Sequence, residues 1–138
     1  MLTGDSPLRS ERSSASGTYQ WLTFQTNSLP EELTISQYPD RLAGRDASAA
    51  DVVKQGAEGG ASRFLDVIED HLKANGPLFS RQPAERRRFH LVMLSRWTRP
   101  MVGPPRSRPN IATLLDKVTA LPSVRRAYEQ EGIADEIC

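Results

Sequence analysis

One stretch decides the fold of this chain: Pro109-Asn-Ile-Ala-Thr-Leu-Leu-Asp-Lys-Val-Thr-Ala-Leu-Pro-Ser-Val-Arg-Arg-Ala-Tyr-Glu-Gln-Glu-Gly132. Its first half carries apolar residues at i, i+3, i+4 and i+7, the spacing of one helix face: Ile111, Leu114, Leu115 and Val118. Pro122 disfavours helical geometry at the residue before it, and Ser123 can cap a second helix. That helix would bury a stripe and end at a glycine: Val124, Ala127, Tyr128 and Gly132. The stretch therefore predicts two helices separated by a proline.

The chain upstream of position 48 predicts a leader followed by a first helical segment. Residues 1–17 are rich in serine, glycine and charge, which favours a flexible leader or a frayed helix start, so the domain is expected over 18–138. Apolar residues then recur at approximately helical spacing: Tyr19, Leu22, Phe24, Leu29 and Leu33. Pro30 either bends this helix or opens a new one capped by Ser28 or Asn27. The segment Tyr38-Pro39-Asp40-Arg41-Leu42, with Gly44, predicts the exit into a loop.

A long second helix is predicted from about Ala49 to Lys73, capped by Ser48 or Asp46. Its expected core face is Phe64, Val67, Ile68 and Leu72, with Leu65 at the flank. Three glycines inside it are costly for a helix, which favours the close approach of a neighbouring helix: Gly56, Gly59 and Gly60. Asn75-Gly76-Pro77 should end it.

The segment Phe89–Trp97 is apolar on most sides, which predicts a helix in the centre of a bundle. Prolines and a glycine between positions 100 and 105 should end it. We expect five or six helices and no strand, so the predicted fold class is all-α, a helical bundle.

Composition narrows the classes of function. A chain of 138 residues with a net charge of +1 predicts a single globular domain. No apolar run approaches the roughly 20 residues that cross a bilayer, and Met1-Leu-Thr-Gly-Asp-Ser-Pro-Leu8 does not resemble a secretory signal, so we expect a cytoplasmic protein. The one cysteine, Cys138, excludes an internal disulfide framework and a Cys-rich zinc site, and its position at the end of the chain argues against catalysis.

Charged and titratable residues offer two further candidate sites. Between Ser80 and Pro109 there are eight arginines against the single acid Glu85: Arg81, Arg86, Arg87, Arg88, Arg96, Arg99, Arg106 and Arg108. They indicate either an anionic partner or charges that meet acids such as Asp66, Glu69 and Asp70; nucleic acid is not expected, because the chain is nearly neutral. The histidines, His71 and His90, lack metal-ligand spacing and are interpreted as structural or surface residues.

Seven short segments together resemble the C-terminal helical domain of bacterial glutathione S-transferases. Tyr19-Gln-Trp-Leu-Thr-Phe24 is similar to the Glu-Trp-Leu-x-Phe of that domain's first helix, and Tyr38–Leu42 to the segment after it. Phe64–Leu72, with the turn Asn75–Phe79, resembles its second helix, and Phe89–Trp97 its central helix. Leu121-Pro122-Ser123-Val124 and Glu131-Gly132-Ile133 resemble its last break and its Glu-Gly-Leu ending.

The resemblance implies a cleft for hydrophobic substrates. Its candidate lining residues are Tyr19, Trp21, Phe24 and Trp97, each of which is alternatively a core aromatic. The family conjugates glutathione to hydrophobic electrophiles, with glutathione held by an N-terminal thioredoxin-like half. No βαβ pattern precedes Tyr19, so we expect no catalytic residue, no cofactor site, no metal site and no conjugation by this chain alone.

Two further departures separate the chain from the family pattern. The family's central helix opens with a Ser/Thr-x-x-Asp cap, whereas Ser80-Arg-Gln-Pro-Ala-Glu-Arg-Arg-Arg88 places Arg88 where the Asp is expected. Arginines oppose the dipole at a helix start, so that start should be destabilised. Pro30 stands where beta-like members carry a histidine that faces the active site.

Two functional hypotheses follow. The first is the hydrophobic-substrate half of a glutathione transferase-like protein, whose partner is a thioredoxin-like domain in another chain or a hydrophobic small molecule. The second is a non-catalytic helical interaction module that self-associates or binds a partner, through the exposed side of its first helix or through the arginines. No membrane partner is expected.

Overall fold

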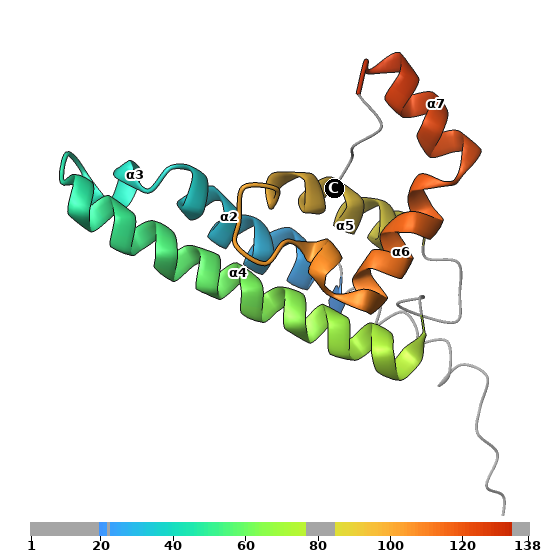
Figure 1. The fold of residues 1–138 in the computed structure, drawn as a ribbon, viewed down its shortest axis with the longest axis horizontal. Helices are drawn as coiled ribbons and strands as arrows, with labels where there is room; N and C mark the ends of the chain where they lie inside the picture. The colour runs from blue at the N-terminus through green and yellow to red at the C-terminus, as the bar shows by residue number, and fades with distance from the viewer. Residues whose placement is uncertain (1–19, 22, 77–84, 134–138) are drawn as a thin grey trace, which may run out of the picture.

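A computed structural model describes residues 20–21, 23–76 and 85–133, and side chains over the same ranges except 85–87. The described part is all-helical and contains no strand, which confirms the all-α prediction (Figure 1). The elements are η1 (a π-helical turn, Phe24–Ser28), α2 (Leu29–Gln37), α3 (Asp40–Ala43), α4 (Ala47–Asn75), α5 (Glu85–Trp97), η2 (a 3-10 turn, Pro105–Ser107), α6 (Pro109–Thr119) and α7 (Pro122–Gln130). Residues 20, 21 and 23 are also helical, and with η1 they form what we call the first helical segment.

The long helix α4 runs along the whole bundle, with α2 and α3 on one side of it and α6 near its end (Figure 1). Asp46 caps it, as one of the two predicted caps, because its carboxylate accepts hydrogen bonds from the amides of Ser48 and Ala49. Those two bonds and one from the Ser48 hydroxyl hold the pKa of Asp46 below its usual value. Gly76, at φ +79°, lies just beyond the end of the helix, where the sequence predicted a stop.

Burial on α4 differs from the predicted face by about one position. Leu65, Ile68 and Leu72 are fully buried, whereas Phe64 is only partly buried. The prediction that Val67 lies in the core is wrong, because its side chain is 49% exposed. The glycine prediction is confirmed at Gly60 alone, where an added Cβ would overlap the carboxyl of Glu32 on α2.

The first helical segment continues into α2 through the π-helical turn η1 instead of stopping at Pro30. Proline in a continuous α-helix lacks an N–H and clashes with the carbonyl four residues earlier, and a wider turn relieves that clash. Ser28 makes no side-chain cap, so its predicted capping role is wrong. The predicted loop after Tyr38 contains the short helix α3 and ends at Gly44 with φ +64°.

Helix α5 packs against α6, α2 and η1. Leu91, Val92 and Leu94 are buried, but Met93 is 60% and Trp97 48% exposed. The prediction of a helix buried on most sides is therefore wrong for one face, which is open to solvent. The expected destabilised helix start begins at Ser80, and residues 80–84 lie outside the described residues, as do Tyr19, Cys138 and the leader 1–17.

The two C-terminal helices form as predicted, except that Ala127, expected in the buried stripe of the second helix, is exposed. Ile111, Leu114, Leu115 and Val118 are all buried on α6, and each such side chain contributes about 1.5–3 kcal/mol by leaving water. On α7, Val124 is buried and Tyr128 packs partly buried against the core. Ser123 does not cap α7, because the helix begins at Pro122 with Leu121 before it. Figure 1 shows α7 projecting away from the bundle beyond α6.

Candidate functional site

An aromatic cluster joins the first helical segment to α4. The Trp21 and Phe24 ring centroids lie 5.6 Å apart with the rings at 79°, and Phe24 meets Phe64 in the same edge-to-face manner at 5.2 Å and 77°. The imidazole of His71 lies against Trp21, with 4.1 Å between centroids. Edge-to-face pairs are worth about 0.5–1.5 kcal/mol beyond their buried area, so the cluster holds these aromatic rings in defined positions.

A pocket of about 230 Å³ opens beside this cluster, and we call it the aromatic pocket. It is lined by Gln20, Trp21, Phe24 and Val67. The half-exposed Val67 forms its α4 side, and Gln20 is the one lining residue with a polar side chain. Two of the four predicted cleft residues, Trp21 and Phe24, therefore line one pocket. Val67 was not predicted to be part of it, because the sequence pattern assigned Val67 to the core.

The structure does not bring Trp97 to the aromatic pocket. Trp97 ends α5 with its side chain half exposed, which excludes a fully buried core position for it. Its carbonyl accepts a hydrogen bond from Gln37 Nε2 at 3.3 Å, which ties the end of α5 to the end of α2. The fourth candidate, Tyr19, lies outside the described residues.

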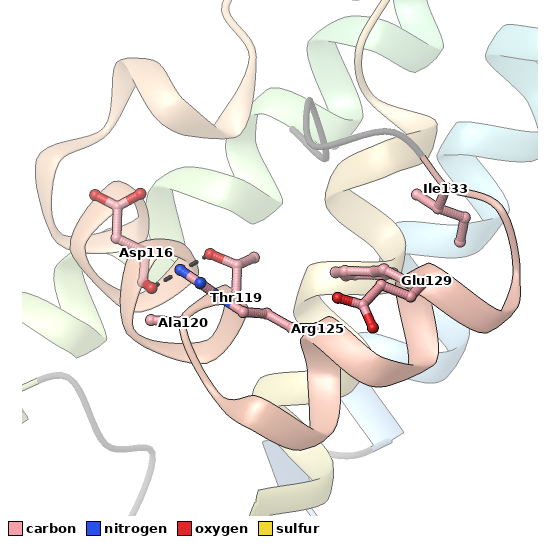
Figure 2. A pocket seen from close by; sticks show the side chains of 7 residues that line it. Asp116, Thr119, Ala120, Arg125, Glu129 and Ile133 are labelled. Atoms are coloured by element: carbon pink, nitrogen blue, oxygen red, sulfur yellow. Dashed lines mark hydrogen bonds between the residues drawn. The ribbon is translucent and has the colours of Figure 1, made fainter.

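A second, polar pocket of about 490 Å³ lies where α7 turns back from α6 (Figure 2). Asp116, Thr119, Arg125 and Glu129 provide its polar side chains, together with Tyr128. Figure 2 shows the Arg125 side chain reaching from α7 toward Asp116 and Thr119. A cation near the end of a helix interacts favourably with the helix dipole, so Arg125 has a structural reason to lie there. Asp116 is itself engaged, because it pairs with Arg106 at 2.7 Å.

A third, shallow groove of about 670 Å³ follows the outer side of η1 and α2. It has a largely apolar lining to which Pro30, Ile35 and Leu42 contribute. Leu42 is 67% exposed, so this groove is the most open of the three.

The arginine-rich stretch does not form one free basic surface. Arg106 pairs with Asp116, and Arg108 is inserted between α4 and α6. The Arg108 guanidinium donates to the Asp66 carboxylate at 2.7 Å and to the carbonyl and hydroxyl oxygens of Ser62 and the carbonyl of Gly103. For these two residues, the expectation that the charges meet acids within the protein is confirmed. His90 likewise has a structural partner, since its Nε2 lies 3.3 Å from the Gln25 carbonyl oxygen.

Sequence reasoning missed how α6 is capped. Arg108 precedes α6 and offers no capping oxygen, and the Glu69 carboxylate of α4 supplies it instead. Glu69 accepts hydrogen bonds from the backbone amides of Asn110 and Ile111 at 3.0 and 2.9 Å, and from Asn110 Nδ2 at 2.6 Å. Partial burial acts to raise the pKa of Glu69, but these bonds and the charge of Arg108 outweigh it and hold the pKa below its usual value. In the sequence, the absence of a capping side chain just before this helix was the one sign that its cap comes from elsewhere.

Two classes of site find no counterpart in the described part of the chain. It contains no group of three or more His, Cys, Asp or Glu side chains placed to hold a metal ion. None of the helices described there is both long enough and apolar enough to traverse a bilayer. Comparison with models of known protein families, with curated proteins and with solved structures finds no match.

Proposed function

We propose that this chain is the helical half of a glutathione transferase-like protein and binds flat, apolar molecules in the aromatic pocket. The proposal rests on one observation: Trp21 and Phe24, two of the residues that the resemblance assigns to the substrate cleft, line the same pocket with Val67. Aromatic faces and one amide are typical of a pocket that binds apolar ligands and orients them through few polar groups.

The helical order supports the same proposal. The segments that carry the resemblance are helical in the described residues: the first helical segment, the long helix α4, helix α5, and α6 and α7 on either side of the Leu121-Pro122 break. Trp97 does not support a shared cleft, since it lies on α5 outside the aromatic pocket. The proposed ligand site is therefore restricted to the first helical segment and α4.

Conjugation is not proposed for this chain alone. Activating a thiol requires a donor or base beside the sulfur, and none of the described residues that line the aromatic pocket (Gln20, Trp21, Phe24 and Val67) has a basic side chain. The proposal therefore assigns ligand binding to this chain, but not catalysis. The chain should bind a chlorinated nitrobenzene weakly but should not accelerate its reaction with glutathione. Turnover well above the uncatalysed rate would contradict this division.

Binding is tested with 8-anilinonaphthalene-1-sulfonate, whose emission rises in apolar sites. Val67→Glu should lower its affinity at least about tenfold, because the substitution places a carboxylate at the wall of an apolar pocket without opening the core. Val52→Glu is the matched control, since Val52 lies on the same helix, is 70% exposed and is absent from the pocket lining. Equal loss in both variants, or in neither, would contradict the proposed site.

The alternative function is a protein-interaction module, and the open face of α5 favours it. Met93 and Trp97 stand four residues apart, so they share one side of the helix, and both are about half exposed or more. Size-exclusion chromatography at low and high salt distinguishes association through this apolar face from association through the arginines. Association through this apolar face should persist at high salt and disappear in Trp97→Ser, whereas association through arginines should weaken with salt.

A further inference from the structure

A titratable group, His71, packs against Trp21, one of the residues that line the aromatic pocket. His71 lies one helical turn beyond Val67 on α4, and its imidazole packs against Trp21 with centroids 4.1 Å apart and rings tilted by 46°. An imidazole is the side chain that ordinarily changes charge between about pH 5 and pH 8. A change of charge at His71 therefore acts on an indole that lines the pocket.

Asn75 selects the neutral form of the ring. Its Nδ2 donates to the carbonyl oxygen of His71 at 3.0 Å and lies 3.3 Å from His71 Nδ1. Because Nδ2 carries only hydrogens, Nδ1 can take part in this contact only as an acceptor, which requires the neutral ring with its proton on Nε2. Protonation of Nδ1 would remove this hydrogen bond and replace it with a cation–π contact between His71 and Trp21. The ring thus has two states, each with its own stabilising contact.

We propose that the aromatic pocket takes aromatic molecules that carry an acidic group, and that protonation of His71 tightens their binding. The inference rests on the proposed function and names the ligand class and the pH response of the same site. Positive charge behind Trp21 attracts an anionic headgroup at the pocket rim, where solvent screening is incomplete, and leaves the apolar contacts unchanged. A neutral aromatic molecule gains nothing from the charge.

The described residues that neighbour His71 on α4 and on the first helical segment are mostly uncharged. On α4, the residues one turn to either side are uncharged: Val67, Ile68, Ala74 and Asn75. Trp21, whose ring packs against His71 from the first helical segment, is uncharged, as are Gln20 and Phe24 in the same pocket lining. The charged neighbours along α4, Asp70 and Lys73, are both exposed to solvent and of opposite sign.

Two dyes of nearly the same shape test the inference. The first is 8-anilinonaphthalene-1-sulfonate, which keeps its negative charge throughout, and the second is the neutral N-phenyl-1-naphthylamine. Dissociation constants are measured at about pH 5.5 and about pH 8, on either side of the imidazole range. The anionic dye should bind about three- to tenfold more tightly at the lower pH, and the neutral dye should change less than about twofold.

Substitutions test whether the pH dependence of dye binding comes from the imidazole of His71. His71→Gln should abolish the pH dependence of the anionic dye while still binding the neutral dye, which also reports that the pocket is intact. His90→Gln is the matched control, because His90 contacts the Gln25 carbonyl instead of the pocket, and it should behave like the unmodified chain. In Trp97→Phe, where Trp21 is the remaining tryptophan, the emission without dye should titrate over the same pH range as the anionic dye's affinity.

The outcomes separate the two proposals. Binding of both dyes with no pH dependence, or a dependence that survives in His71→Gln, overturns the role of His71 and leaves the apolar site standing. An unchanged Trp21 emission across the range also overturns it, even if His71→Gln does not fold. Absence of binding by either dye at both pH values overturns the proposed function and this inference with it.

Discussion

The most consequential single residue outside the aromatic pocket is Glu69. One carboxylate satisfies two backbone amides at the start of α6 and the Asn110 side chain, and so joins two helices that are about forty residues apart in sequence. A helix normally obtains this oxygen from the residue just before it. Here the neighbouring Arg108 is instead committed to Asp66 and Ser62, so the cap comes from α4.

Glu69→Gln should lower the free energy of unfolding by about 1–3 kcal/mol, because the amide keeps only one acceptor oxygen, places an NH2 donor opposite the second backbone N–H and loses the negative charge at the helix start. Urea denaturation measures the change as a lower midpoint at unchanged slope. Asp70→Asn is the control, since Asp70 is exposed on the same helix, and it should stay within about 0.5 kcal/mol. Equal effects of the two substitutions would show that the cap contributes nothing.

The same carboxylate predicts an acid-dependent loss of stability. The pKa of Glu69 is lower in the folded chain than its ordinary value of 4.5, so its contribution to stability is complete above that value. The contribution is lost as the pH falls from there through the folded-state pKa. The unmodified chain should therefore lose more stability between about pH 5 and pH 3 than Glu69→Gln does. Parallel pH curves for the two proteins would contradict the assignment.

Alanine substitutions at two glycines of α4 test whether a neighbouring side chain leaves room for a methyl group at each position. Nothing lies near Gly56, so Gly56→Ala should stabilise the chain by about 0.5–1 kcal/mol through helix propensity. Gly60→Ala should gain less, because its methyl group must displace the Glu32 carboxyl. Adding Glu32→Ala should restore the full gain at position 60 but leave Gly56→Ala unaffected. Thermal unfolding measures all three, and equal gains at both glycines would contradict the close contact.

Among the helical elements, the π-helical turn η1 contains a buried polar side chain. Gln25 is fully buried in it, and neither polar atom of its amide has a hydrogen-bond partner in the part of the chain that the structure describes. Such a group costs roughly 1–3 kcal/mol. Gln25→Leu should therefore raise the urea midpoint by an amount equivalent to about 1 kcal/mol or more. Gln55→Leu, at an exposed position of α4, should change it little, and a destabilised Gln25→Leu would contradict this view.

Elements with strong periodicity were predictable, and those shaped by distant contacts were not. The stripe Ile111 to Val118 and the Asp46 cap depend on neighbours within a few residues, so a local pattern contains them. The π-turn arises because a helix continues past Pro30, which depends on its packing against α4. The exposed side of α5 was missed for a similar reason: apolar content does not say which faces a bundle covers.

For the candidate site, the resemblance supplied residues but not their grouping. Trp21 and Phe24 were named from a short motif, and the structure places them together in one pocket. Val67 lines the same pocket and His71 packs against Trp21, but both belong to a helix about fifty residues away in sequence, and the resemblance of Phe64–Leu72 assigned neither of them to the cleft. Only the register between the first helical segment and α4 sets them beside the aromatic rings, and that register is a tertiary property.

For the whole molecule, stability should decline from α4 toward α7. A nine-residue helix is too short to persist alone in water, and α7 depends on Val124 and the partly buried Tyr128 for its attachment. Hydrogen exchange should therefore show that amides of 122–130 open with a much smaller free energy than those of α4. Val124→Ala should accelerate exchange in α7 strongly, yet Leu115→Ala, within the core of α6, should lower protection throughout the bundle by about 2–5 kcal/mol. Uniform loss of protection in Val124→Ala would mean that α7 belongs to the same cooperative unit as the core.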